Sequence, residues 1–213
     1  PVPVGFWRSV GASHNGFIIE SFVDQLAAAA GKDPLAFRLG LLQKHPRARR
    51  VLETAAQKAG WGKQPKKGQA FGIAYHLSFG TYVAQVAEVS VDRGSGRITV
   101  HKITCAVDCG SVINPNTVVA QMEGGIVMGL SAALKEKMEF ADGGVKTTNF
   151  GDYDLLRMSE TPEIEVHIVT NKDPLGGIGE PGVPPVAPAV ANAIFAATGA
   201  RLWSLPMTAD AVK

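Results

Sequence analysis

Residues 82–108, YVAQVAEVSVDRGSGRITVHKITCAVD, carry the clearest structural signal in the chain. Apolar residues alternate with polar ones along 85–92 and again along 97–108, and Arg93-Gly94-Ser95-Gly96 lies between the two runs. The glycines permit the positive φ angles of a tight hairpin turn. The pattern therefore predicts two antiparallel strands joined by that turn.

Further strands and helices are predicted on both sides of this hairpin. Apolar residues recur at helical spacing from Phe17 up to Gly31, a glycine typical of a C-terminal cap, and Asp33-Pro34 is typical of a helix start. Strands are also predicted over 70–76, 82–91, 163–170 and in a short pair around Gly143-Gly144; helices over 46–59, 115–134 and 185–198. These elements predict an α+β fold of mixed helices and antiparallel strands.

The whole of 1–213 is predicted to be one domain, with a helical lead-in over 1–62 and mixed sheet and helices over 69–213. A hydrophobic content of 46% excludes disorder, and the net charge of +2 has no concentrated patch that would favour nucleic acid. The longest apolar run considered as a membrane span, 185–197, is short and interrupted by Asn192. The start Pro1-Val2-Pro3-Val4, without Met, predicts excision from a longer chain.

The residues that could ligate a metal ion do not have the spacing of a known metal site. Cys105 and Cys109 are most simply small apolar residues near a strand end, with a disulfide between them open if the protein is exported. The histidines His14, His76 and His101 lack metal-ligand spacing and are interpreted as surface or core residues. Asp108 and Asn114 are interpreted as turn-forming residues. No metal ligand is predicted from this chain.

One segment departs from what folding alone requires: Gly176-Gly177-Ile178-Gly179-Glu180-Pro181-Gly182-Val183-Pro184-Pro185, between a strand and an apolar helix. Its glycines let backbone amides approach a bound group, but the spacing is not that of a Walker loop. Glu180 beside a helix start would be held ionised, which suits a general base. The other interpretation, left open, is a first-turn residue that complements the helix dipole.

The segment Gly177-Ile178-Gly179-Glu180-Pro181 resembles the Gly-x-Gly-Glu-Pro loop of the xanthine dehydrogenase and aldehyde oxidase family, the molybdenum hydroxylases. Further segments resemble that family in the same order: Trp7-Arg8-Ser9-Val10-Gly11, the turn Asp108–Pro115, the helix segment Gln121-Met122-Glu123-Gly124-Gly125, and Asn149-Phe150 with Tyr153. The first segment with His14 most resembles the branch of the isoquinoline 1-oxidoreductase large subunit and membrane-associated bacterial aldehyde dehydrogenases.

The resemblance implies catalytic roles for Glu180 and Arg8. Glu180 would take the proton from a molybdenum-bound hydroxyl, whose oxygen attacks an electron-poor carbon of an aldehyde or N-heterocycle while hydride passes to the sulfido ligand. Arg8 would stabilise developing negative charge as a fixed cation. The alternative that Arg8 only pairs with a phosphate or a carboxylate stays open.

The resemblance also implies that Gln121, Gly124, Gly125, Gly177 and Gly179 bind the cofactor, a molybdopterin cytosine dinucleotide with molybdenum. The chain would then be the C-terminal molybdopterin-binding domain of a large subunit. From the residues alone, Gly124 and Gly125 serve equally well as helix-packing positions, and Gln121 as a bridge between buried backbone groups.

Partners follow from the same resemblance. Family members are several times longer, so the remainder of the molybdenum-binding subunit is expected to complete the site. Two cysteines cannot hold a four-cysteine cluster, so iron–sulfur clusters are expected on a partner subunit. The substrate would be a small aldehyde or N-heterocycle and the acceptor a cytochrome c or quinone, with a periplasmic or membrane-associated location favoured. The alternatives are a short subunit that completes a site with a separate chain, and a non-catalytic cofactor-binding or assembly module.

Overall fold

The hairpin predicted from residues 82–108 forms the centre of the sheet. In the computed structural model, which describes residues 4–212, β2 (Thr81–Val91) and β3 (Ile98–Asp108) pair antiparallel, with Tyr82 opposite Asp108 and Val91 opposite Ile98. The Asp92 carboxylate accepts hydrogen bonds from the backbone amides of Gly94 and Ser95 and so closes the turn. The hairpin prediction is confirmed. The predicted start at Pro1 lies outside the described residues.

Two more strands extend the sheet on opposite sides. Strand β1 (Gln69–Ser78) pairs antiparallel with β2, and β6 (Glu163–Ile168) pairs with β3, which gives the order β1-β2-β3-β6 among the described residues. The β3–β6 pairing is parallel. A parallel neighbour requires a long crossover connection, and the chain supplies one through α4 and residues 135–162. The strand was predicted, but its direction departs from the antiparallel pattern of the other three.

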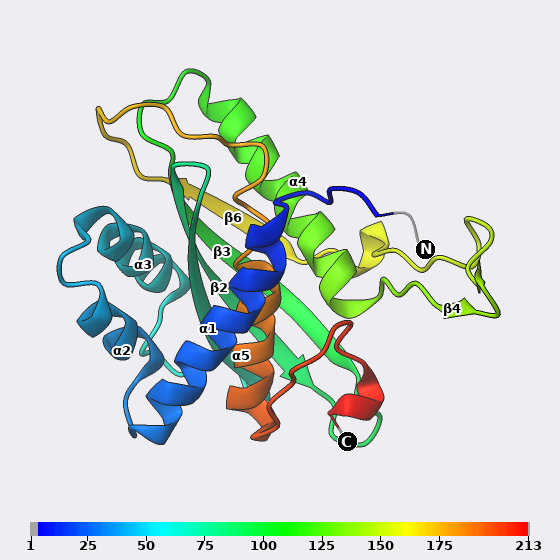
Figure 1. Cartoon of the computed structure of the whole chain (residues 1–213). Coiled ribbons are helices and arrows are strands. Elements are labelled where there is room, and N and C mark those ends of the chain that lie inside the picture. Colours follow the sequence, from blue (N-terminus) through cyan, green and yellow to red (C-terminus); the bar gives the residue numbers. More distant parts are fainter. Residues whose placement is uncertain (1–3, 213) are drawn as a thin grey trace.

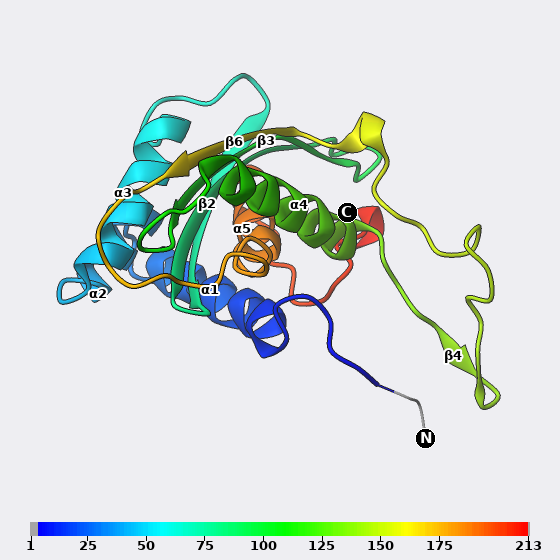
Figure 2. The ribbon, with the colours of Figure 1, turned by 90° about the horizontal axis from the view of Figure 1, so that it is seen from above.

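Helices cover both faces of this sheet (Figure 1, Figure 2). Helix α3 (Pro46–Ala59), preceded by α2 (Pro34–Leu41), packs on one face, where Val51, Leu52 and Ala55 join a buried cluster with Ile73 and Val86. Helices α4 (Pro115–Leu134) and α5 (Val186–Thr198) cover the other face, and α1 (Gly11–Ala29) packs against α5. Short elements complete the described chain: β4 (Phe140–Ala141), β5 (Gly144–Val145), η1 (Met158–Glu160) and η2 (Ala209–Ala211).

The helix ends follow the residues that predicted them. Asp33 accepts a hydrogen bond from the Ala36 amide and Pro34 begins α2. Gly31 has a φ of 63° just beyond α1, where Lys32 N–H donates to Ala27 O, as in a Schellman cap. At its other end α1 begins at Gly11, before the apolar pattern starts. The early start has a local cause, because the chain turns sharply at Ser9 and Val10.

Helix α4 has the length and apolar composition of a membrane span, with a mean hydropathy of 1.3 over its most apolar window. Among the sequence-based expectations only 185–197 is a possible span, and α4 is not among them. In the fold, Met122, Ile126 and Leu130 of α4 are fully buried in the core beside α5 and β6. Core helices of soluble proteins pass the same test of length and composition. The apolar composition of α4 is therefore explained by its burial in the core, and this helix also carries Gln121.

Gly72 marks the closest approach between the sheet and α5. A Cβ added at this buried β1 position would overlap the backbone of Ala189 and Ala193. We expect Gly72→Ala to lower the free energy of unfolding by about 1–3 kcal/mol or more, because backbone cannot yield as a flexible side chain can. Urea denaturation of the purified chain measures the change.

Gly40→Ala in α2 is the matched control for Gly72→Ala. An added Cβ there meets no atom within 4 Å, so the variant should be neutral or gain up to about 1 kcal/mol in helix propensity. Equal stability of the wild type and Gly72→Ala would contradict the close packing of α5 on β1.

Candidate functional site

The sharp turn before α1 brings Arg8 into contact with the glycine-rich segment. Arg8 Nε donates a hydrogen bond to Gly179 O at 2.7 Å, and Arg8 Nη2 donates to Gln121 Oε1 at 2.8 Å. These bonds join three elements: the turn before α1, the first half of α4, and the segment that leads into α5 (Figure 1). The two bonds thereby join Arg8 to residues that are 113 and 171 positions away in the sequence.

Ser9 fixes the neighbouring carboxylate. Its backbone N–H donates to Glu180 Oε1 at 3.0 Å, and its hydroxyl donates to Glu180 O at 2.6 Å. Ser9 is fully buried and Glu180 is half-buried. We refer to Arg8, Ser9, Gln121, Gly124, Gly179 and Glu180 as the Arg8–Glu180 cluster. Ser9 was not predicted as a site residue, and its only sequence signal was its place next to Arg8.

The backbone at this turn is strained. Ser9 and Val10 have φ angles of 75° and 49°, in the left-handed region that residues other than glycine rarely enter. For β-branched Val10 this is a genuine outlier, and such strain persists where surrounding contacts enforce it. Both bonds from Ser9 to Glu180 are among the contacts that hold the turn.

Glu180 lies beside a different helix from the one expected. Helix α5 begins at Val186 with Pro185 as its N-cap, so the interpretation of Glu180 as a first-turn residue of that helix is wrong. Its carboxylate instead accepts the amide of Ser9, immediately before α1. A carboxylate at that place is favoured by the partial positive charge of the α1 N-terminus.

The predicted glycines separate into two groups. Gly179 and Gly124 have room for a side chain: an added Cβ at Gly179 meets no atom within 4 Å, and one at Gly124 would lie 3.8 Å from Arg8 Nη1. Gly125 and Gly177 make packing contacts, since added Cβ atoms would lie 3.3 Å from Gly182 Cα and 3.0 Å from Phe79 Cβ. The first pair leaves open space at the cluster, and the second pair lets α4 and the loop pack closely.

Buried polar contacts anchor the loop to the sheet. Gln85 on β2 donates to Gly182 O at 2.8 Å, and Thr81 donates through its hydroxyl to Gly177 O at 2.6 Å. Gly177 N–H donates to Phe79 O at 2.7 Å. The backbone of the segment is therefore fixed on both sides of Glu180.

The residues interpreted as structural behave so in the fold. Asn114 caps α4 by accepting from the Asn116 and Thr117 amides, and Asp108 accepts from the Gly110 amide. Cys105 and Cys109 are free buried thiols, and burial raises the pKa of Cys105 to about 12. Within residues 4–212 no group of three or more His, Cys, Asp and Glu side chains is arranged to hold a metal ion.

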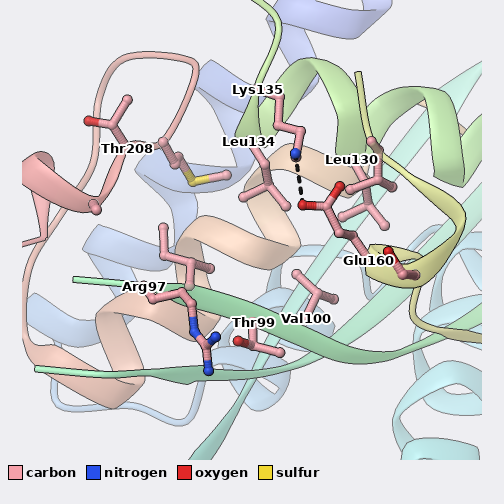
Figure 3. Close-up of a pocket in the computed structure, with 13 residues that line it drawn as sticks. Arg97, Thr99, Val100, Leu130, Leu134, Lys135, Glu160 and Thr208 are labelled. Carbon is pink, nitrogen blue, oxygen red and sulfur yellow. Dashed lines mark ion pairs between the residues drawn. The ribbon is translucent and has the colours of Figure 1, made fainter. Parts of the chain in front are cut away.

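A cavity of about 550 Å³ is lined by other residues, several of which Figure 3 labels. It lies between the start of β3, the C-terminal half of α4, η1 and η2, and none of the cluster residues lines it. Lys135 Nζ lies 2.8 Å from Glu160 Oε1 at its wall. The predicted site residues therefore do not meet in this cavity but beside the first half of α4.

Comparison with known proteins identifies what the chain resembles. Residues 20–162 match the family model described as a molybdopterin cofactor-binding domain. The beta subunit of isoquinoline 1-oxidoreductase from Brevundimonas diminuta is 40% identical over 97% of this chain and 27% of its own length. One subunit of nicotinate dehydrogenase from Pseudomonas putida is 35% identical over 100% of this chain and 19% of its own length.

A solved structure shows the same fold. The aldehyde oxidoreductase of Desulfovibrio gigas aligns with a TM-score of 0.76 at 16% identity, over 97% of this chain and 41% of that protein. At this identity the likeness concerns the fold alone. The α+β expectation is confirmed, and this chain spans between about a fifth and a quarter of the length of the curated relatives above.

Proposed function

The chain belongs to the family of molybdopterin cofactor-binding domains of molybdenum hydroxylases, and we propose that it forms the C-terminal part of a large subunit that oxidises an aldehyde or N-heterocycle. The observation that carries the proposal is the Arg8–Glu180 cluster, in which three distant segments present a cation, an amide and a carboxylate side by side. The names of the relatives support the substrate classes, since they include an isoquinoline oxidoreductase and a nicotinate dehydrogenase.

The open side of the cluster fits a molybdopterin. Gly124 and Gly179 leave space that a side chain would otherwise occupy. Next to that space, the guanidinium of Arg8 can pair with phosphate and the amide of Gln121 with the polar edge of a pterin. Arg8, Gln121, Gly124 and Gly179 would hold the cofactor. When bound, the molybdenum cofactor supplies a two-electron acceptor and an oxygen derived from water.

The free oxygen of Glu180 supports a role as proton acceptor. Its Oε1 is occupied by the Ser9 amide, while within the described residues no hydrogen bond reaches Oε2. One oxygen is thus held by the Ser9 amide, and the second oxygen keeps its lone pairs free to take a proton. Arg8, on the turn before α1, donates to Gly179 O next to Glu180 and forms no ion pair with Glu180 among residues 4–212.

The exposed face of α1 supports a partner that completes the site. Ile18, Ile19, Phe22 and Leu26 are each at least 42% exposed. Contiguous exposed apolar residues often mark an interaction surface. We propose that the remainder of the molybdenum-binding subunit contacts this face of α1, that the cofactor is the cytosine dinucleotide form, and that iron–sulfur clusters reside on a partner subunit.

Metal and nucleotide analysis tests the proposal. We expect the isolated chain to contain no molybdenum, and the full-length subunit to contain molybdenum and cytidylate in equal amounts. Inductively coupled plasma mass spectrometry and nucleotide chromatography after acid release measure both. Stoichiometric cofactor in the isolated chain would instead favour an independent cofactor-binding module, and activity restored by mixing with a separate chain would favour a short subunit.

A further inference from the structure

Arg47 reaches from one face of the sheet to the end of its central strand. It is the second residue of α3, which packs on the face away from α4 and α5. Its guanidinium donates from Nε to Asp108 Oδ2 at 2.9 Å and from Nη2 to Asp108 Oδ1 at 2.6 Å. The same group stacks 4.4 Å from the centre of the Tyr82 ring. A two-bond fork of this kind fixes orientation as well as charge.

Asp108, the last residue of β3, is buried and accepts several hydrogen bonds. Its side chain is 1% exposed, and Oδ1 also accepts from Gly110 N–H at 3.0 Å and from Asn171 Nδ2 at 2.6 Å. Burial raises the pKa of Asp108, but hydrogen bonds from Arg47, Gly110 and Asn171 outweigh burial and hold it below its ordinary value. The carboxylate is therefore charged at neutral pH, and Arg47 is its counter-charge.

Asp108 bonds to two segments, the turn 109–111 and the segment 171–176. Ser111 donates to Asp173 O through its amide at 2.9 Å and through its hydroxyl at 3.0 Å. Gly176 N–H donates to Cys109 O at 2.8 Å. Arg47 Nε also lies 3.3 Å from Asp173 Oδ2. The turn 109–111 and the segment 171–176 are thus hydrogen-bonded to each other. Arg47 contacts an acidic residue at each of them: Asp108, which precedes the turn, and Asp173, which lies within the segment.

Each segment leads directly to one side of the Arg8–Glu180 cluster. The turn 109–111 continues through Asn114 into α4, which carries Gln121, and the segment 171–176 continues to Gly179 and Glu180. Among the described residues no hydrogen bond or ion pair joins Arg47 to Arg8, Gln121 or Glu180. Arg47 can therefore act on the cluster through the residues it contacts, Asp108 and Asp173 at the two segments and Tyr82 on β2.

We infer that Arg47 is a positioning residue for the reaction proposed above: its fork to Asp108 and its contact with Asp173 set the placement of the Glu180 segment against the helix that carries Gln121. The inference rests on the proposed function. The physical basis is that a displacement of about 1 Å in a reacting group can cost on the order of 10²-fold in rate. A lysine keeps the charge of Arg47 but cannot form the fork.

The test compares Arg47→Met, Arg47→Lys and Arg49→Met in the full-length cofactor-loaded enzyme. Arg49 is the matched control, since it lies on the same helix but bonds to Leu39 O and Glu53 instead. Three quantities are measured: kcat per bound molybdenum, KM, and hydrogen–deuterium exchange of peptides that cover 109–114 and 171–180. Exchange reports on the coupling of the segments even if the enzyme has no measurable turnover, so the inference and the proposed function can fail separately.

We expect Arg47→Met to lower kcat by roughly 10–10²-fold with little change in KM, and to raise exchange in both peptides. Arg47→Lys should retain part of kcat, and Arg49→Met should match the wild type in all three quantities. Unchanged exchange in Arg47→Met would overturn the coupling. Raised exchange with kcat within twofold of wild type would overturn the positioning role, because Arg47 would then only stabilise the fold. If Arg47→Met does not fold, the same comparison of hydrogen–deuterium exchange and kcat is made with Arg47→Lys.

Discussion

The Glu180→Gln variant of the full-length, cofactor-loaded enzyme is expected to turn over roughly 10²–10⁴-fold more slowly than the wild type, the range typical of a lost general base. Glutamine has nearly the same size and keeps an oxygen that can accept the Ser9 amide at the position of Oε1. The turn before α1 should therefore keep its shape. What the variant loses is the basicity of the second oxygen.

Steady-state kinetics normalised to molybdenum content measure this effect, because normalisation separates loss of chemistry from loss of cofactor. Glu53→Gln is the matched control: it removes the same charge from an exposed residue of α3, on the other face of the sheet, where Glu53 pairs with Arg49. We expect that control to keep wild-type turnover. If Glu180→Gln retains activity within a few-fold, Glu180 is not the base.

The second large effect concerns stability rather than turnover. Arg38 on α2 is 2% exposed and contacts α1, where it donates to Glu20 Oε2 at 2.7 Å and to Asp24 Oδ1 at 3.3 Å. Arg38→Met should lower the free energy of unfolding by about 3–5 kcal/mol, because it leaves the buried Glu20 carboxylate without its cation, whereas Asp24 keeps its ion pair with Arg201. Chemical denaturation of the chain measures the loss.

The expected pH dependence distinguishes this cause from lost packing. Burial raises the pKa of Glu20, and Arg38 opposes that rise. Without Arg38 the pKa of Glu20 in the folded state rises further above its unfolded value, so folding takes up a proton and stability increases as pH falls. The destabilisation by Arg38→Met should therefore be smaller at about pH 5 than at about pH 8.

Two further variants complete the stability test. Arg50→Met removes an arginine from an exposed position of α3 and should change stability by no more than about 0.5 kcal/mol. Glu20→Gln combined with Arg38→Met should recover part of the loss, since the unpaired charge is removed. A loss that is independent of pH and unrelieved by Glu20→Gln would contradict the electrostatic explanation.

Most elements of the fold could be predicted because their signals are local. The turn Arg93-Gly94-Ser95-Gly96 and the alternation around it determine a hairpin from neighbouring residues alone, and the caps at Asp33, Asn114 and Gly199 act within one helical turn. The parallel pairing of β6 with β3 has no local signal. It depends on how the crossover through α4 packs on the sheet.

The candidate site shows the same division. Arg8, Gln121, Gly179 and Glu180 were singled out from a resemblance of short segments, and the structure brings all four together. Ser9, Arg47 and the packing roles of Gly125 and Gly177 were not distinguished, since each depends on a neighbour remote in the chain. Asp108 was interpreted correctly as a turn residue, but its ion pair with Arg47 was not foreseen.

From the sequence by itself one obtains the elements, their ends and the residue types at each motif, because backbone preference, capping and periodicity act over a few neighbouring residues. Tertiary structure alone decided that the Glu180 carboxylate is held by the turn before α1 rather than by the start of α5. The physical reason is that Ser9 and Glu180 are 171 positions apart. Their hydrogen bond exists because α1, α4 and α5 pack on one face of the sheet and bring the two backbones together.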